Sequence, residues 1–449
     1  MRTSPDWARF ESFISEIMAQ EHVAGAAVGV SLRGQVIYAR GFGEGSIETR
    51  RPVTEDTVFG IASVSKSFAA LAVMQLVDDG LVDPLAPVVE YLPEFSLPRL
   101  GDVRAVRVHH CLSHTTGVPP LKRRQGEFSE FGRHIEYLSG YDTEMLGRPG
   151  EYLSYCNDTF MLSGAILERL TGRRFRDQVR ERILEPLGMS RTTYELEQLA
   201  SWDNVTGLYN LDSAKTELQA KQWPELGTYH VGGGIRSTVL DLLRYGDMYC
   251  ALGHAPGGGR VVSEAGVLRM RAPVIPVTSG SHYCYALQLT PGYHGVTLVE
   301  HGGSLPGVAS RWGYIPEEGV AAVVLTNVGG APSDLIWTGL VNTWLGLAPE
   351  SPRTEPEATY PASDDQLARL TGLYAADEGV RLRVCRSDDG TLRVEGEGLN
   401  RPLRVTAPDR AVYQMQRQEK PLRFHLPSDG RAPAWAVSTG LRMVRRAAE

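Results

Sequence analysis

The hydrophobic pattern at the start of the chain predicts a helix followed by a hairpin. Apolar residues recur at helical spacing after Ser4, a residue type that caps helices, and Pro5, which suits a first helical turn. The set is Trp7, Phe10, Phe13, Ile14, Ile17 and Met18. Residues 24–46 then form two apolar runs around the turn signal Arg33-Gly34, and we expect two strands there.

A second helix is expected to begin near Ser63, and its pattern differs from that of the first. Residues 68–77 are apolar nearly all round, and no charged residue follows Lys66 until Asp78. A helix that is apolar on every side is buried rather than half exposed. Lys66, in the first turn, must therefore lie close to low-dielectric surroundings.

The next part of the chain predicts an insertion and then a return to strands. Residues 84–230 are helical and loop-rich, with frequent Pro and Gly. Strand patterns return at 294–303 and at 310–327, where Pro316 to Gly319 makes a hairpin turn, and a helix follows over 333–347. We therefore expect an α+β fold, an antiparallel sheet flanked by helices with an all-helical insertion.

A change of composition marks the end of this fold. Residues 349–364 are rich in Pro, Glu, Ser and Thr, which is typical of a linker. Residues 365–449 alternate apolar and polar positions around turn signals at Asp388-Asp389-Gly390 and Ser428-Asp429-Gly430. We predict a first domain over 1–348, a linker over 349–364 and a small antiparallel β-barrel domain over 365–449.

Charge and cysteine usage exclude several classes of function. The 449 residues carry a net charge of −7 without a basic tract, so a nucleic-acid partner is not expected. The five cysteines are scattered without the spacing of a zinc site, and we expect no metal and no cofactor.

The start of the chain lacks the apolar core of a signal peptide, and no stretch approaches the roughly 20 apolar residues of a membrane span. We expect a cytoplasmic protein without a membrane partner.

Ser63 and Lys66 are the first candidates for chemistry. Residues three apart at a helix start lie on one face, and the helix dipole favours negative charge developing there. Burial lowers the pKa of a lysine, so its neutral amine can take the proton of a serine nucleophile. The alternative is that Lys66 extends to solvent from the helix edge, since this pattern also arises by chance. Ser65 offers a competing hydroxyl, but on another face.

Two further segments add side chains of the same chemistry. Tyr155 and Asn157 precede a helical pattern; a tyrosine beside a lysine ammonium loses its proton more readily, and an asparagine amide positions a lysine and a substrate. The structural alternative makes Tyr155 a core aromatic and Asn157 or Asp158 a helix cap. His301 and Gly303 end a strand, where glycine permits close approach of a substrate. The alternative there is a simple strand-terminating turn.

The order SxxK, YxN and a histidine–glycine strand end resembles a known superfamily, that of the serine β-lactamases and penicillin-binding proteins. The likeness is to its class C β-lactamase-like branch of DD-peptidases, D-aminopeptidases and esterases. Residues 111–119, 183–192 and 231–245 also resemble family segments. The C-terminal barrel resembles the lipocalin-like modules appended to some members.

This resemblance implies a serine acyl-enzyme mechanism. Ser63 would attack a carbonyl, Lys66 and Tyr155 would move protons, and Asn157 would orient the substrate. Backbone N–H groups of Ser63 and Ser304 would form the oxyanion hole.

His301 stands where many members have the lysine of a KTG motif, and a histidine holds a carboxylate less firmly. We therefore expect hydrolysis of a small amide, a peptide containing D-amino acids, or an ester. His114 is interpreted as structural.

Two alternatives stay open at this point. One is a class C-type β-lactamase, which His301 disfavours. The other is a non-catalytic penicillin-binding or sensor-like protein, which the intact set of Ser63, Lys66, Tyr155 and Asn157 disfavours. The expected partner is a small molecule or short peptide, and a homo-oligomer is possible.

Overall fold

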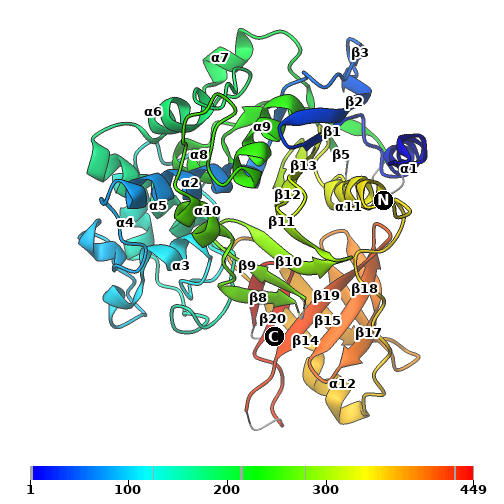
Figure 1. The fold of residues 1–449 in the computed structure, drawn as a ribbon. Helices are drawn as coiled ribbons and strands as arrows, with labels where there is room; N and C mark the ends of the chain where they lie inside the picture. Colours follow the sequence, from blue (N-terminus) through cyan, green and yellow to red (C-terminus); the bar gives the residue numbers. More distant parts are fainter. Residues whose placement is uncertain (1–3, 125, 213–215, 279, 429–430, 448–449) are drawn as a thin grey trace.

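A large sheet with helices on both faces sits above a closed barrel in the computed structural model (Figure 1). The structure describes residues 4–124, 126–212, 216–278, 280–428 and 431–447. The α+β class predicted from the sequence is confirmed, including the antiparallel pairing of the sheet and the barrel at the C-terminal end.

The central sheet has nine antiparallel strands in the order β3-β2-β1-β13-β12-β11-β10-β9-β8. Strands from both ends of the first part of the chain meet at its centre, because β1 pairs with β13. The bounds are β1 Gly25–Leu32, β2 Gln35–Ser46, β3 Arg51–Pro52, β8 Ile275–Thr278, β9 Ser281–Tyr283, β10 Gln288–Tyr293, β11 Val296–Leu305, β12 Val308–Ile315 and β13 Val320–Thr326. Two short pairs lie outside it, β4 Phe59–Gly60 with β7 Arg236–Ser237 and β5 Leu208–Leu211 with β6 Leu218–Lys221.

Alternation along the central strands assigns side chains to two separate cores. In β13, Val320, Ala322 and Val324 join the core beneath α1 (Trp7–Gln20) and α11 (Ser333–Trp344). The intervening Ala321, Val323 and Leu325 join the core on the other face. Both faces of the sheet are therefore buried, which explains why β1 and β13 are apolar except for Ser31 and Thr326.

The second face carries α2 and the helical insertion (Figure 1). The helices of this side are α2 Ser65–Asp78, α3 Val108–Leu112, α4 Phe131–Gly140, α5 Asn157–Thr171, α6 Phe175–Val179, α7 Leu196–Ala200, α8 His230–Gly233, α9 Val239–Cys250 and α10 Glu264–Arg271. Every residue of α2 from Ser65 to Leu76 is buried, as its all-round apolar pattern predicted.

The barrel is an eight-stranded antiparallel closed sheet, completed where β14 pairs with β21. Its elements are α12 Asp364–Leu370, β14 Gly372–Ala375, β15 Arg381–Arg386, β16 Leu392–Gly396, β17 Leu399–Ala407, β18 Arg410–Met415, β19 Gln418–His425, β20 Ala436–Thr439 and β21 Arg442–Arg446. Gly390 takes φ +82° in the turn after β15, as the first turn signal required. Residues 429 and 430 of the second signal lie outside the described residues. The linker at 349–364 and the lipocalin-like label stay predictions.

The first helix begins later than its pattern suggested. We expected Ser4 to cap it, but the helix begins at Trp7 and Asp6 is the cap, accepting a hydrogen bond from the Arg9 amide at 3.0 Å. Ser4 and Asp6 are both residue types that accept a hydrogen bond from a free amide of the first helical turn. The sequence alone could therefore not distinguish these two positions for the cap.

Candidate active site

Ser63 lies on a 3₁₀ turn over Ala62–Val64 that leads directly into α2. Strand β11 lies tightly against this turn. A Cβ at Gly303 would come 2.2 Å from the Ile61 carbonyl oxygen and 3.0 Å from the Ser63 amide nitrogen. The sequence suggested that glycine here admits a substrate, but the close approach is between the strand and the serine turn.

Lys66 is brought to Ser63 by the first turn of α2. Its Nζ lies 3.2 Å from Ser63 Oγ and 3.0 Å from the carbonyl oxygen of Gly232. The side chain is only 1% exposed. Burial lowers the pKa of Lys66 well below its usual value, and the positive charges of Arg123 and Arg442 lower it further. The neutral amine, which can accept a proton, is therefore much more favoured than in an exposed lysine.

Tyr155 covers the amine of Lys66, whose Nζ lies 5.0 Å from the centre of the tyrosine ring. Burial raises the pKa of Tyr155 to about 12, and contact with Ser63 and the charge of Arg442 partly oppose this rise. We expected a lysine ammonium to promote loss of the tyrosine proton, but burial has the largest effect on the pKa of Tyr155. Tyr155 thus keeps its proton near pH 7, and within the described chain its hydroxyl completes no hydrogen bond.

Packing and one backbone hydrogen bond fix the position of Tyr155. The ring of His114, fully buried as its structural interpretation required, lies 3.9 Å from the tyrosine ring. From the opposite side, the Tyr155 amide donates to the carbonyl of Leu441 at 2.8 Å. Leu441 belongs to the barrel, in the turn between β20 and β21. The barrel is thus part of the wall behind Tyr155.

Asn157 is the first residue of α5 and lines a cavity of about 30 Å³ together with Ser63, Lys66 and Ser304. This volume is close to that of one water molecule. The residue before the helix is Cys156, which makes no side-chain cap, so neither Asn157 nor Asp158 is the cap that the structural alternative proposed. Asp158 is buried and accepts a hydrogen bond from the Tyr229 hydroxyl.

His301 lies on β11 two residues before Gly303, buried against Tyr283. Its Nε2 is 3.0 Å from the Tyr283 hydroxyl, and its Nδ1 is 2.6 Å from the Gly302 carbonyl oxygen. Burial first, and then the charge of Lys66, lowers the pKa of His301 to about 3. The ring is therefore neutral near pH 7 and brings no positive charge to the site.

Four residues near Ser63 were not singled out by sequence analysis. They are Gly232, Arg123, Glu378 and Arg442. Gly232 acts through its backbone carbonyl, and its only sequence signal was its place in the family-like segment 231–245. Glu378 and Arg442 come from the barrel, so no local pattern could connect them to Ser63.

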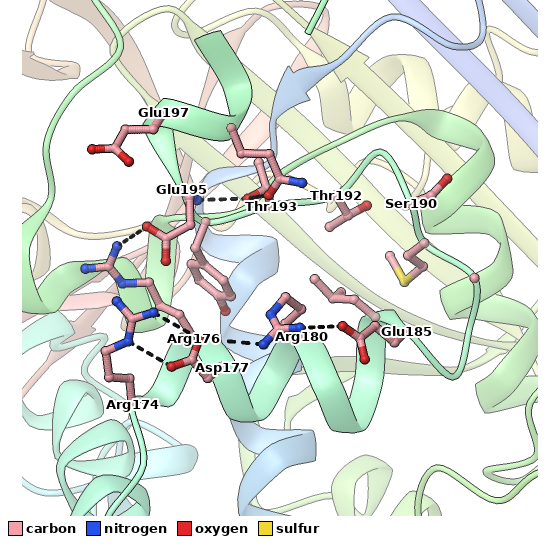
Figure 2. Close-up of a pocket in the computed structure, with 15 residues that line it drawn as sticks. Arg174, Arg176, Asp177, Arg180, Glu185, Ser190, Thr192, Thr193, Glu195 and Glu197 are labelled. Carbon is pink, nitrogen blue, oxygen red and sulfur yellow. Dashed lines mark hydrogen bonds and ion pairs between the residues drawn. The ribbon is translucent and has the colours of Figure 1, made fainter. Parts of the chain in front are cut away.

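A larger cavity, of about 800 Å³, lies away from these residues (Figure 2). Its arginines are each paired with a carboxylate: Arg174 with Asp177, Arg176 with Glu195 and Arg180 with Glu185. None of the residues predicted for the site lines it. Three arginines and four carboxylates line it, so most of its charges are paired, and none of its lining residues belongs to the Ser63 cavity.

Comparison with known proteins gives the family of this fold and site. A family model described as Beta-lactamase matches residues 10–342. The chain belongs to the Beta-lactamase family. This membership, with the resemblance of the site motifs, makes it a serine hydrolase of the β-lactamase type.

Among the described residues, no helix is both long and apolar enough to cross a membrane.

The proteins that are similar to this chain carry names of more than one activity. Penicillin-binding protein 4 of Amycolatopsis lactamdurans is 29% identical over 397 residues, which cover 84% of this chain and 99% of that protein. A D-aminopeptidase of Gluconobacter oxydans is 26% identical and covers 84% of this chain and 70% of its own length. The octameric penicillin-binding protein homologue from Pyrococcus abyssi is 27% identical, with a TM-score of 0.72, covering 98% of this chain and all of that one.

Proposed function

We propose that this protein hydrolyses a small amide, a peptide containing D-amino acids, or an ester through an acyl-enzyme intermediate on Ser63. The observation that carries the proposal is the 3.2 Å contact between Ser63 Oγ and a buried lysine amine. A neutral amine at hydrogen-bond distance is what a serine hydroxyl requires to become a nucleophile.

In the proposed reaction, Ser63 Oγ forms a bond to the substrate carbonyl carbon while its proton passes to Lys66 Nζ. Negative charge develops on the carbonyl oxygen, which the amides of Ser63 and Ser304 stabilise. The bond to the leaving group then breaks, and Tyr155, which is protonated near pH 7, supplies the proton to it. Water then attacks the resulting ester and gives one proton to the Tyr155 phenolate. The bond to Ser63 Oγ breaks, the acid product leaves, and Lys66 returns its proton to Ser63.

Two features support a substrate other than a β-lactam. His301 is neutral, so it cannot hold a carboxylate as the lysine of the KTG motif would. A D-aminopeptidase is among the relatives that match most of this chain.

The proposal is tested with Ser63→Ala and a substrate panel. The panel contains D- and L-aminoacyl 4-nitroanilides, short-chain 4-nitrophenyl esters and a chromogenic cephalosporin. We expect Ser63→Ala to lose at least about 1,000-fold in kcat/KM on any active substrate, and to lose labelling by a fluorophosphonate. Ser65→Ala, which removes the competing hydroxyl, is the matched control.

Unchanged labelling of Ser63→Ala would contradict the assignment. Fast cephalosporin hydrolysis would replace the preferred substrate class with the β-lactamase alternative. Stoichiometric acylation without turnover would favour the sensor-like alternative.

A further inference from the structure

Arg123 is the charged residue that lines the Ser63 cavity together with Lys66. It lies in the loop that follows α3, and its Nε donates to Glu378 Oε1 at 2.6 Å. Glu378 is in the barrel, in the loop between β14 and β15, and its side chain is only 8% exposed. A residue of the active-site cavity is therefore held in place by the barrel.

The same carboxylate serves a second arginine. Arg442, at the start of β21, donates from Nε to Glu378 Oε2 at 2.5 Å, and its guanidinium lies 5.6 Å from the centre of the Tyr155 ring. Two guanidinium groups thus share one carboxylate, which leaves one net positive charge in this cluster. The buried Glu378 has both oxygens engaged, so it fixes the orientation of both arginines.

Among the described residues, no acidic side chain lines the cavity to balance this charge. Asp158 is another buried acid whose charge acts on Lys66, but it lies against Tyr229 and His134 and is already hydrogen-bonded. Burial lowers the pKa of Lys66 well below its usual value and the pKa of His301 to about 3. The cluster of Arg123, Glu378 and Arg442 keeps one net positive charge, and Arg123 is its member that lines the cavity.

We propose that Arg123 binds a carboxylate carried by the substrate near its scissile carbonyl, and that Glu378 and Arg442 of the barrel position its guanidinium for this. The bonds to Glu378 use Nε and Nη2. No described residue accepts a hydrogen bond from Nη1, which leaves that edge of the planar group for a ligand. This inference rests on the proposed function and names the substrate class.

Size-matched substrate pairs test the inference on the full-length protein. Aspartyl and asparaginyl 4-nitroanilides of the D series differ by a carboxylate on the acyl side. D-alanyl 3-carboxy- and 3-carbamoyl-4-nitroanilides differ by a carboxylate on the leaving-group side. The corresponding nitrophenyl esters are used if the panel shows that esters are the better substrates. The measured quantity is the ratio of kcat/KM, carboxylate over amide, at a pH where each variant has its full activity.

We expect the wild type to prefer the carboxylate in at least one pair. Arg123→Gln should lower that ratio about tenfold or more, mainly through KM, because hydrogen bonds to charged groups are the strong ones. Arg123→Lys should restore part of it. Arg124→Gln is the matched control, because the Arg124 side chain pairs with Glu127 instead, and it should leave the ratio unchanged.

Glu378→Gln is a second test of the same kcat/KM ratio, in a variant that keeps both Arg123 and Arg442. It removes the carboxylate that orients Arg123, so the ratio should fall although both arginines remain. Thermal unfolding of each variant checks that the barrel contact survives. An unchanged ratio in both Arg123→Gln and Glu378→Gln, with turnover still dependent on Ser63, would overturn this inference alone. Turnover that persists in Ser63→Ala would instead overturn the proposed function.

Discussion

At the scale of single residues, the charge of Lys66 is set by groups from both parts of the chain. Burial is the main cause that lowers its pKa, and Arg123 and Arg442 add to it, while Glu378 and Asp158 oppose it. One of the two arginines, Arg442, is a barrel residue. The proton acceptor of the proposed reaction is therefore adjusted by a neighbour that is nearly 380 residues away in sequence.

The fall of kcat/KM at low pH tests how these charges set the pKa of Lys66. We expect kcat/KM to fall as the pH is lowered, because a protonated Lys66 cannot accept the Ser63 proton. Arg442→Gln removes a charge that lowers the pKa of Lys66, so the pKa rises and the fall in activity moves to higher pH. Profiles of kcat/KM against pH with the best substrate of the panel measure this.

Arg445→Gln is the control for the pH profile. Arg445 lies on the same strand as Arg442, and it pairs with Glu144 at 3.1 Å rather than with Glu378. If the two variants shift the profile equally, or if Arg442→Gln leaves it in place, the proposed influence of Arg442 on Lys66 is wrong.

Sequence reasoning was most successful where the contact is local. The Ser63–Lys66 contact follows from helical spacing, and the burial of Lys66 follows from the apolar residues around it. The raised pKa of Tyr155 did not follow from the sequence, since it depends on burial by His114 and by the barrel. Such effects arise only when segments distant in sequence are packed together.

At the scale of elements, the site depends on how closely β11 approaches the serine turn. Gly303 and the turn at Ala62–Val64 touch through backbone atoms, and the amides of Ser63 and Ser304 are the proposed oxyanion donors. Backbone contact leaves no flexible side chain that could move aside. The spacing of the two donors is thus set by the absence of a side chain at one position.

Gly303→Ala should therefore be costly. Its Cβ would meet the Ile61 carbonyl at 2.2 Å, so the strand or the turn must shift. We expect kcat/KM to fall about 100-fold, in line with the effect of misplacing a catalytic group by about 1 Å.

Gly302→Ala is the neighbouring comparison, because its Cβ would meet the end of the Arg311 side chain at 2.9 Å and a backbone atom only at the ordinary contact distance of 3.7 Å. We expect a loss below about tenfold there. Equal losses in the two variants would show that the Gly303 contact with the serine turn is not what matters.

The elements themselves were predicted unevenly. The hairpin of β1 and β2, the hairpin of β12 and β13, and the buried α2 follow from clear periodicity and turn residues. Strands β8 to β10 were not predicted, since they are short and contain Pro276 and Pro291, which weaken a strand pattern. Pro276 lies in the edge strand β8, and Pro291 lies where the pairing of β10 with β11 is irregular, two places where proline is tolerated.

At the scale of the whole molecule, the barrel contacts the first part of the chain at two separate places. Near the site, Tyr152 and Leu146 form an apolar cluster with Trp435, Ala436 and Met443 of the barrel. On the other side, beneath the sheet, Lys420 of β19 pairs with Asp334 of α11 at 3.0 Å (Figure 1). Two contacts restrict rotation of the barrel more than one would.

Trp435→Ala tests whether this docking supports the site. The Trp435 ring lies 5.7 Å from that of Tyr152, three residues before Tyr155. Losing a half-buried tryptophan should lower the free energy of unfolding by about 1–3 kcal/mol. Because the Tyr155 amide is bonded to the barrel turn, kcat/KM should also fall, by roughly three- to tenfold.

Arg383→Ala, on an exposed position of β15, is the control for Trp435→Ala and should change neither quantity appreciably. Thermal or denaturant unfolding and steady-state kinetics on the same preparations separate the two effects. If Trp435→Ala lost stability but kept full activity, the barrel would stabilise the chain without positioning Tyr155. The Glu378 and Arg442 contacts would then have to hold the site without help from the apolar cluster.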